Sequence, residues 1–191
     1  MASPGDALCG ECSTGERLII FTIGHSTRPI DEFVALLRAN GIRTLVDIRT
    51  IPRSRHNPQF GRQALDCALG TIGYVHMPEL GGLRHTRSDS PNLAWRNESF
   101  RGFADYMLTK EFADGIQRLL DLAAQAGPLA IMCAEAVPWR CHRGLVSDAL
   151  LARGVCVRDI IGPGATRPHQ LTRFADVQGE QVRYPGPAAP S

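Results

Sequence analysis

The chain has 191 residues, of which 43% are hydrophobic and 21% are charged, and its formal net charge is +2. This length suits one domain with a sizeable core, and the composition is that of an ordinary globular protein. So small a net charge gives no argument for nucleic-acid or membrane binding. No apolar run approaches the roughly 20 residues needed to cross a bilayer, and we expect a cytoplasmic protein with no membrane partner.

Strands and helices alternate along the first part of the chain. Residues 18–23 are a β-branched, apolar run of strand length, and residues 30–37 follow with helical spacing. Residues 44–48 predict a second short strand, and residues 63–69 are compatible with a short helix. A third strand is predicted at residues 74–77.

The second part of the chain continues this alternation after a long polar segment. Residues 81–99 have little periodicity and are expected to be a loop, whose length is typical of functional segments. Helical spacing extends over residues 100–123. An apolar strand at residues 128–133, a helix at residues 144–153 and a last strand at residues 155–161 complete the pattern.

Strands separated by helix-length segments imply right-handed crossovers and a mainly parallel sheet covered on both faces. We therefore expect an α/β fold: a single three-layer α/β/α domain with about five strands, spanning residues 17–178. Residues 1–16 are polar and small and are expected to be a flexible extension that carries Cys9 and Cys12. Residues 179–191 are proline-rich and are expected to be a flexible tail.

Polar side chains gather where the predicted strands end. His25 follows the first strand, Arg49 the second, and Cys133 and Glu135 the strand at residues 128–133. Since parallel strands share one carboxyl edge, these groups are expected to face one crevice, where such folds bind ligands. His25, Cys133 and Glu135 are therefore candidate catalytic residues.

The segment that starts at Cys133 also contains Cys141 and His142. A thiol at a strand end, ahead of a helix N-terminus, is expected to have a lowered pKa, so Cys133 is a candidate nucleophile. His142 is a candidate acid or base, although adjacent residues at a helix start point about 100° apart and are not expected to aim at one atom. Cys133, Cys141 and His25 would suit zinc or iron, but their spacing matches no common structural zinc pattern.

Arginines are concentrated around the same strand ends. Residues 43–62 contain five arginines and one aspartate, which favours an anionic partner. The candidate anion-binding residues are Arg49, Arg53, Arg55, Arg140 and Arg143. Asp47 is expected to support the site by pairing with an arginine.

Several linked motifs together resemble one family. They are Thr22-Ile-Gly-His-Ser-Thr27, Leu45-Val-Asp-Ile-Arg49 with Pro52-Arg-Ser-Arg55, Leu80-Gly-Gly82, Phe100-Arg-Gly-Phe-Ala-Asp-Tyr-Met107, Met132-Cys-Ala-Glu135 and Cys141-His-Arg143. Over roughly residues 18–177 the chain is similar to the DUF488 family of bacteria and archaea. The resemblance adds weight to the site residues but implies no particular reaction, because the family has no general activity attached to it.

A looser similarity links the chain to the architecture of rhodaneses and cysteine phosphatases. Those enzymes place a cysteine before a tight loop and a helix, as Cys133 is placed here. The phosphatases have an arginine six positions after the cysteine, whereas Arg140 comes seven after it and Glu135 lies inside the loop, where it would repel a phosphate. This similarity concerns the fold alone.

The sequence favours an enzyme, a hydrolase or transferase, that acts on an anionic small molecule or nucleic acid by thiolate or metal-assisted chemistry. One alternative is a nucleic-acid-binding or repair accessory protein without turnover, suggested by the arginines and by Trp95 and Trp139. Another is a metal-binding or sensing protein that uses Cys133, Cys141 and a histidine.

Overall fold

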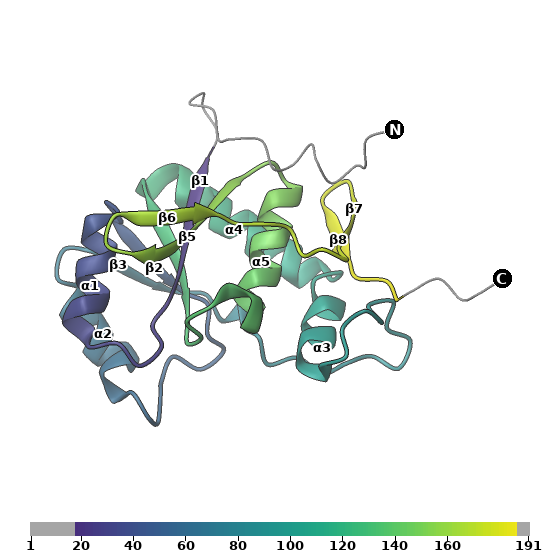
Figure 1. The fold of residues 1–191 in the computed structure, drawn as a ribbon, viewed down its shortest axis with the longest axis horizontal. Coiled ribbons are helices and arrows are strands. Elements are labelled where there is room, and N and C mark those ends of the chain that lie inside the picture. The colour runs from purple at the N-terminus through teal and green to yellow at the C-terminus, as the bar shows by residue number, and fades with distance from the viewer. Residues whose placement is uncertain (1–17, 187–191) are drawn as a thin grey trace.

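The computed structural model describes residues 18–186. The N-terminal residues, including Cys9 and Cys12, and those after residue 186 lie outside that range. The main sheet has six strands in the order β3-β2-β4-β1-β5-β6 (Figure 1). These strands are β1 (Ile19–Gly24), β2 (Thr44–Asp47), β3 (Gly73–His76), β4 (Leu129–Cys133), β5 (Cys156–Gly162) and β6 (Ala165–Pro168).

The pairing of the strands confirms the α/β prediction. Strand β1 pairs in parallel with β4 and β5, and β2 pairs in parallel with β3 and β4. Strand β6 runs antiparallel to β5 and adds a sixth strand to the five expected. The central strand β4 is buried along its whole length, which explains why its sequence shows no alternation between polar and apolar residues.

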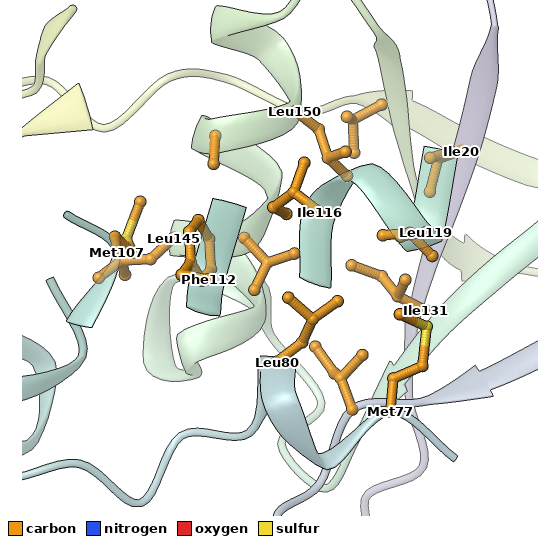
Figure 2. Packing of buried hydrophobic residues seen from close by; sticks show 14 of the residues in the cluster. Ile20, Met77, Leu80, Met107, Phe112, Ile116, Leu119, Ile131, Leu145 and Leu150 are labelled. Carbon is orange, nitrogen blue, oxygen red and sulfur yellow. The ribbon is translucent and has the colours of Figure 1, made fainter. Parts of the chain in front are cut away.

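Helices cover both faces of the sheet and complete the three layers (Figure 1). They are α1 (Ile30–Ala39), α2 (Arg62–Leu69), α3 (Glu98–Tyr106), α4 (Lys110–Ala126) and α5 (His142–Ala152). One face packs against α1 and α2 through a cluster that contains Phe33 and Leu65. The other face packs against α3, α4 and α5 through a larger cluster (Figure 2), in which Ile116 and Leu145 are fully or almost fully buried.

The helical stretch predicted at residues 100–123 is two helices. The side chain of Asn97 accepts a hydrogen bond from the Ser99 N–H at the start of α3. Thr109 caps α4 in the same way, with its hydroxyl accepting from the Phe112 N–H at 3.3 Å. A threonine cap in the middle of a continuous apolar pattern is the signal that separates the two helices.

The long loop at residues 81–97 is fixed by the buried carboxylate of Asp105. Its oxygens accept hydrogen bonds from the Ser90 hydroxyl at 2.5 Å, the Asn92 amide at 2.9 Å and the Arg87 backbone N–H at 2.9 Å. The loop is therefore held in place by the Asp105 carboxylate, whose oxygens are hydrogen-bonded as buried polar atoms usually are.

The ordered chain continues past residue 178, where we expected the domain to end. Strands β7 (Asp176–Gln178) and β8 (Gln181–Arg183) form a hairpin beside α5 (Figure 1). Tyr184 is fully buried and donates a hydrogen bond to the Asp148 carboxylate at 2.8 Å. Residues 179–186 are thus part of the packed domain. Across residues 18–186, none of the helices has the length and apolar character to span a bilayer.

Candidate functional site

The ends of β1, β2 and β4 are joined by backbone hydrogen bonds. The His25 N–H donates to the Cys133 carbonyl at 3.0 Å, and the Ile48 N–H donates to the Met132 carbonyl at 3.0 Å. Gly24 lies so close to this junction that a β-carbon would come 1.8 Å from the Glu135 carbonyl oxygen. The carboxyl edge therefore brings together the segments that carry His25, Arg49 and Cys133, as the parallel topology requires.

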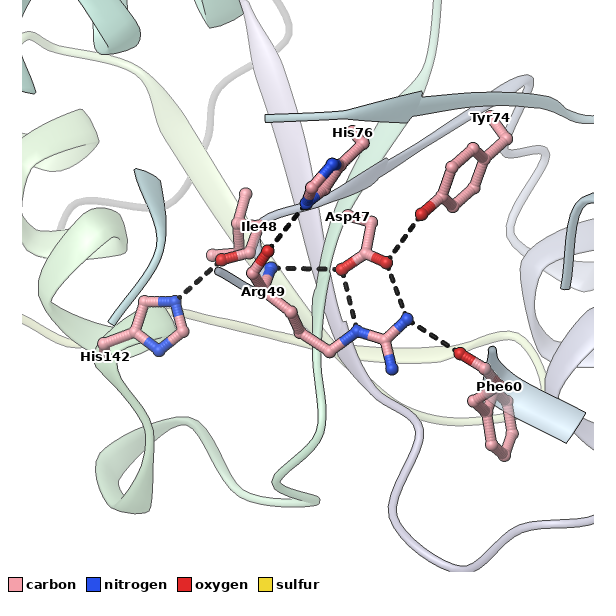
Figure 3. Close-up of polar contacts among 7 residues, drawn as sticks. All are labelled: Asp47, Ile48, Arg49, Phe60, Tyr74, His76 and His142. Carbon is pink, nitrogen blue, oxygen red and sulfur yellow. Dashed lines mark hydrogen bonds and ion pairs between the residues drawn. The ribbon is translucent and has the colours of Figure 1, made fainter. Parts of the chain in front are cut away.

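Two thiols and an imidazole meet at this edge, and we call Cys133, Cys141 and His142 the sulfur cluster. The Nδ1 atom of His142 lies 3.7 Å from Cys133 Sγ and 3.6 Å from Cys141 Sγ. The Nε2 atom lies 3.1 Å from the Ile48 carbonyl oxygen (Figure 3), which can only accept, so Nε2 carries the hydrogen. The lone pair of a neutral His142 therefore points from Nδ1 towards both sulfurs.

Cys141 and His142 approach the same point because Cys141 is not yet helical. It is the N-cap of α5, with φ −139° and ψ 144°, and its Sγ accepts the Arg143 N–H at 3.4 Å. The expectation that these neighbours would diverge by a helical step was wrong, since an extended N-cap residue directs its side chain back over the first turn.

The two thiols have shifted pKa values in opposite directions. A hydrogen bond from Cys141 lowers the pKa of Cys133 well below its ordinary value in spite of burial, and the positive charge of Arg143 lowers it further. The same contact with Cys133, together with burial, raises the pKa of Cys141. When one proton is lost from this pair, Cys133 is the sulfur that carries the charge.

The Arg49 guanidinium lies at the end of β2, on the side away from His142 (Figure 3). Its guanidinium makes a two-pronged ion pair with Asp47, at 2.9 Å and 2.6 Å, and donates to the Phe60 carbonyl at 2.8 Å. Tyr74 donates to the same carboxylate at 2.8 Å. Arg49 is 6% exposed, and its Nη1 has no hydrogen-bond partner among the described residues.

His25 is fixed next to Arg49 through Phe60. The rings of His25 and Phe60 stack with their centroids 4.2 Å apart. The Nδ1 of His25 donates a hydrogen bond to the Ser26 carbonyl at 2.8 Å. Ser26 has φ 51°, a left-handed conformation uncommon for a residue other than glycine. Burial lowers the pKa of His25, so the ring is neutral near pH 7 and its Nε2 carries a lone pair. This Nε2 finds no partner within residues 18–186.

The remaining candidate residues are placed differently. The side chains of Glu135, Arg53 and Arg55 are exposed on loops, and that of Arg140 is exposed at the end of the short 3-10 helix η3 (Pro138–Arg140). Arg143 is buried, and its guanidinium donates to the carbonyls of Glu135 at 3.3 Å and Ala136 at 3.4 Å. Arg143 therefore braces the loop after Cys133, whereas we expected it to contact an anion. Among the histidines, His142 and not His25 lies with the two sulfurs.

Two residues of β3 were not among the predicted site residues. Tyr74 bonds to Asp47, and the Nε2 of His76 lies 2.8 Å from the Arg49 carbonyl oxygen. Their alternate positions on a strand that adjoins β2 are a signal that could have identified them, because residues two apart point to the same face of a sheet.

Comparison with known proteins identifies one family. A family model described as a domain of unknown function, DUF488, matches residues 29–150. That segment includes Asp47, Arg49 and the whole sulfur cluster. No curated protein matches the chain, and no solved structure matches it either.

Proposed function

The chain belongs to the DUF488 family, and we propose that it is an enzyme that binds an anionic, phosphate-like group of its substrate at Arg49 and carries out its reaction beside Cys133. The family description supplies no activity, so the proposal rests on the carboxyl edge of the sheet. It applies equally to a small phosphate ester and to a nucleotide.

The observation that carries this proposal is a pair of unused polar atoms. The Nη1 of Arg49 and the Nε2 of His25 are both buried and lack a hydrogen-bond partner among the described residues. An unsatisfied buried polar group costs about 1–3 kcal/mol, so two of them on residues that contact the same phenylalanine are explained best by a ligand that satisfies both. Both residues contact Phe60, and the charge of Cys133 acts on both.

The two atoms have complementary chemical roles. Arg49 Nη1 is a cationic donor whose direction is set by Asp47, which suits an oxygen of a phosphate. His25 Nε2 is an acceptor and takes the proton of an attacking hydroxyl or water. The attacking oxygen forms a bond to phosphorus, the ester P–O bond breaks, and the proton passes from His25 to the leaving oxygen.

The sulfur cluster offers two routes to this reaction. In one route the Cys133 thiol gives its proton to His25 and its sulfur attacks phosphorus. The ester P–O bond breaks, the alcohol leaves with that proton, and water then breaks the S–P bond and returns a proton to the sulfur. In the other, Cys133, Cys141 and His142 would hold a metal ion, and the chemistry that such an ion would supply is activation of the attacking water. The exposed side chains of Arg53, Arg55 and Arg140 attract the anion, and Glu135 assists as a second acid or base.

Calorimetry with inorganic phosphate tests the anion site. His25→Asn keeps a donor near the Ser26 carbonyl but deletes Nε2, and the paired change Asp47→Asn with Arg49→Gln removes the guanidinium without leaving a buried charge. We expect both variants to bind phosphate at least about tenfold more weakly than the unaltered protein. The exposed His85→Asn is the matched control. Equal affinity in all four proteins, or no binding in any, would refute the proposal.

A second candidate function, nucleic-acid binding without turnover, is favoured by one group of exposed side chains. Arg53 and Arg55 are exposed after β2, and Trp139 is 59% exposed with the Arg167 guanidinium over its ring. Trp95 does not belong to this group, because it packs inside an aromatic cluster. This function predicts that DNA or RNA is retained at low salt and lost steeply as salt rises.

A further inference from the structure

We propose that Cys133, Cys141 and His142 bind one zinc-like divalent cation through Sγ, Sγ and Nδ1, with a fourth coordination position left for water or substrate. The choice of these three ligands is argued from their geometry alone and does not depend on the proposed function. Only the reaction in which the cation takes part rests on the proposed function.

The distances between the three ligand atoms fit a tetrahedral cation. Zinc binds sulfur at about 2.3 Å and nitrogen at about 2.0–2.1 Å, so neighbouring sulfur and nitrogen ligands are separated by about 3.6 Å. The Nδ1 of His142 lies 3.6 Å from Cys141 Sγ and 3.7 Å from Cys133 Sγ, and all three ligand atoms lie within 4.8 Å of one another. A cation at the centre would require only small movements of the side chains.

The surroundings of the ligands are those of a metal site. A histidine ligand nearly always donates its other ring N–H to a carbonyl or carboxylate, and His142 donates to the Ile48 carbonyl. Cys141 Sγ accepts the backbone N–H of Arg143, a bond that supports a thiolate ligand. The ring of His142 is packed edge-on against Phe103, with centroids 5.1 Å apart.

A cation also explains the direction of His142 better than thiols alone. The bare Nδ1 can accept the proton of only one S–H group, yet it lies at nearly equal distances from two sulfurs. One cation would satisfy the nitrogen and both sulfurs at once. Two thiolates and one imidazole favour zinc or a similarly soft divalent ion over magnesium or calcium.

Three protein ligands are typical of a catalytic zinc, whereas structural zinc sites have four. Within residues 18–186, no fourth histidine, cysteine or carboxylate joins the group. The free position would then hold the water that attacks the anion bound at Arg49, because zinc lowers the pKa of a bound water to about 7. This selects the metal-assisted route for the proposed enzyme.

Cobalt substitution tests the site directly. Protein without an affinity tag is reduced, stripped with a chelator and titrated with Co²⁺. We expect one equivalent to bind, with thiolate-to-cobalt charge transfer in the near ultraviolet and the strong visible bands of tetrahedral cobalt. Zinc should displace the cobalt and abolish both features.

The variants each remove one ligand and keep the local structure. Cys133→Ser removes one sulfur, Cys141→Ser removes the other and leaves a good N-cap, and His142→Gln keeps a donor for the Ile48 carbonyl but deletes Nδ1. All three should lose tetrahedral, stoichiometric cobalt binding. The matched control is Cys67→Ser, since Cys67 is exposed on α2, and it should bind cobalt as the unaltered protein does.

Several outcomes would overturn the metal site: no stoichiometric cobalt binding by the unaltered protein, full binding in Cys141→Ser, or loss of binding in Cys67→Ser. If the protein does not bind cobalt, and mass spectrometry finds a Cys133–Cys141 disulfide after exposure of the protein to air, the two cysteines are a redox pair instead. Phosphate calorimetry on the same metal-free protein reports on Arg49 and His25 separately. Retained phosphate binding with no cobalt binding would therefore reject the metal alone, and the reverse result would reject the proposed anion site alone.

Discussion

Gly82 lies directly against the ring of His142. A β-carbon built on Gly82 would come 2.5 Å from Nδ1 and 2.6 Å from Cγ of that ring, closer than such contacts occur in proteins. Gly82 of the Leu80-Gly-Gly82 motif thus permits the approach that directs His142 towards the sulfurs.

Gly82→Ala should therefore displace His142 without removing a ligand atom. Loss of a supporting contact around a metal ligand typically costs about 10–100-fold in metal affinity, and we expect a loss of that size in a cobalt titration. The matched control is Gly73→Ala, where a β-carbon would meet only ordinary contacts at 3.7 Å. Similar cobalt affinities for the two variants would show that Gly82 does not position His142.

The Asp47 carboxylate should be more important for stability than the Tyr74 hydroxyl that donates to it. It is fully buried and pairs with Arg49, so Asp47→Ala leaves the guanidinium buried and unpaired. Breaking a buried pair in this way costs about 3–5 kcal/mol, whereas Tyr74→Phe removes one hydrogen bond and should cost about 1 kcal/mol. Urea unfolding at pH 7 measures both, and a smaller loss for Asp47→Ala than for Tyr74→Phe would contradict this ranking.

His169 should make stability depend on pH in the alkaline range. Burial alone would lower its pKa, but its hydrogen bonds to Asp148 and Asp159 outweigh burial and raise the pKa from 6.5 to about 9. Because the folded pKa is the higher one, this stabilisation is complete below pH 6.5 and is lost as the pH rises towards 9. At about 1.4 kcal/mol per pKa unit, the change is roughly 3 kcal/mol.

His169→Gln cannot be protonated and should not show this change. Its free energy of unfolding should be lower than that of the unaltered protein at pH 6 and should approach it by pH 9. Chemical unfolding at several pH values measures the difference between the two proteins. A constant difference from pH 6 to pH 9 would show that His169 is not held as a cation between the two carboxylates.

Truncation should separate the packed part of the C-terminal segment from the residues that follow it. A protein that ends at residue 178 loses β8 and Tyr184, which is fully buried against Asp148. Loss of a large buried aromatic side chain costs about 3–5 kcal/mol, so this variant should unfold at a clearly lower temperature. A protein that ends at residue 186 is the control. Equal melting temperatures would argue that residues 179–186 contribute nothing to the fold.

The fold could be predicted because buried parallel strands have a strong signal. The apolar run of β4 is bounded by Gly127 and Cys133, and helix-length segments lie on both sides. The signals that were missed are local. Thr109 divides one apolar pattern into two helices, and Tyr184 is buried in a segment whose prolines suggested a tail. Single residues of this kind act through tertiary contacts that periodicity does not contain.

The positions of the candidate residues in the fold could be predicted better than their contacts. Parallel topology places His25 and Cys133 at one edge whatever their contacts are. The role of Arg143 depends on whether its side chain turns to the loop carbonyls, and the role of His142 depends on the N-cap geometry of Cys141. Those directions are decided by packing within a few ångströms, which sequence spacing does not specify.

The most direct test of the central claim is whether the sulfur cluster and Arg49 bind the same ligand. Inorganic phosphate is titrated into the cobalt-substituted protein while the visible cobalt bands are recorded. If the anion held at Arg49 reaches the fourth position on the metal, phosphate should shift these bands, and the variant with Asp47→Asn and Arg49→Gln should require at least about tenfold more phosphate for the same shift. An unchanged cobalt spectrum at saturating phosphate, or the same titration curve in both proteins, would show that the sulfur cluster and Arg49 do not serve one ligand.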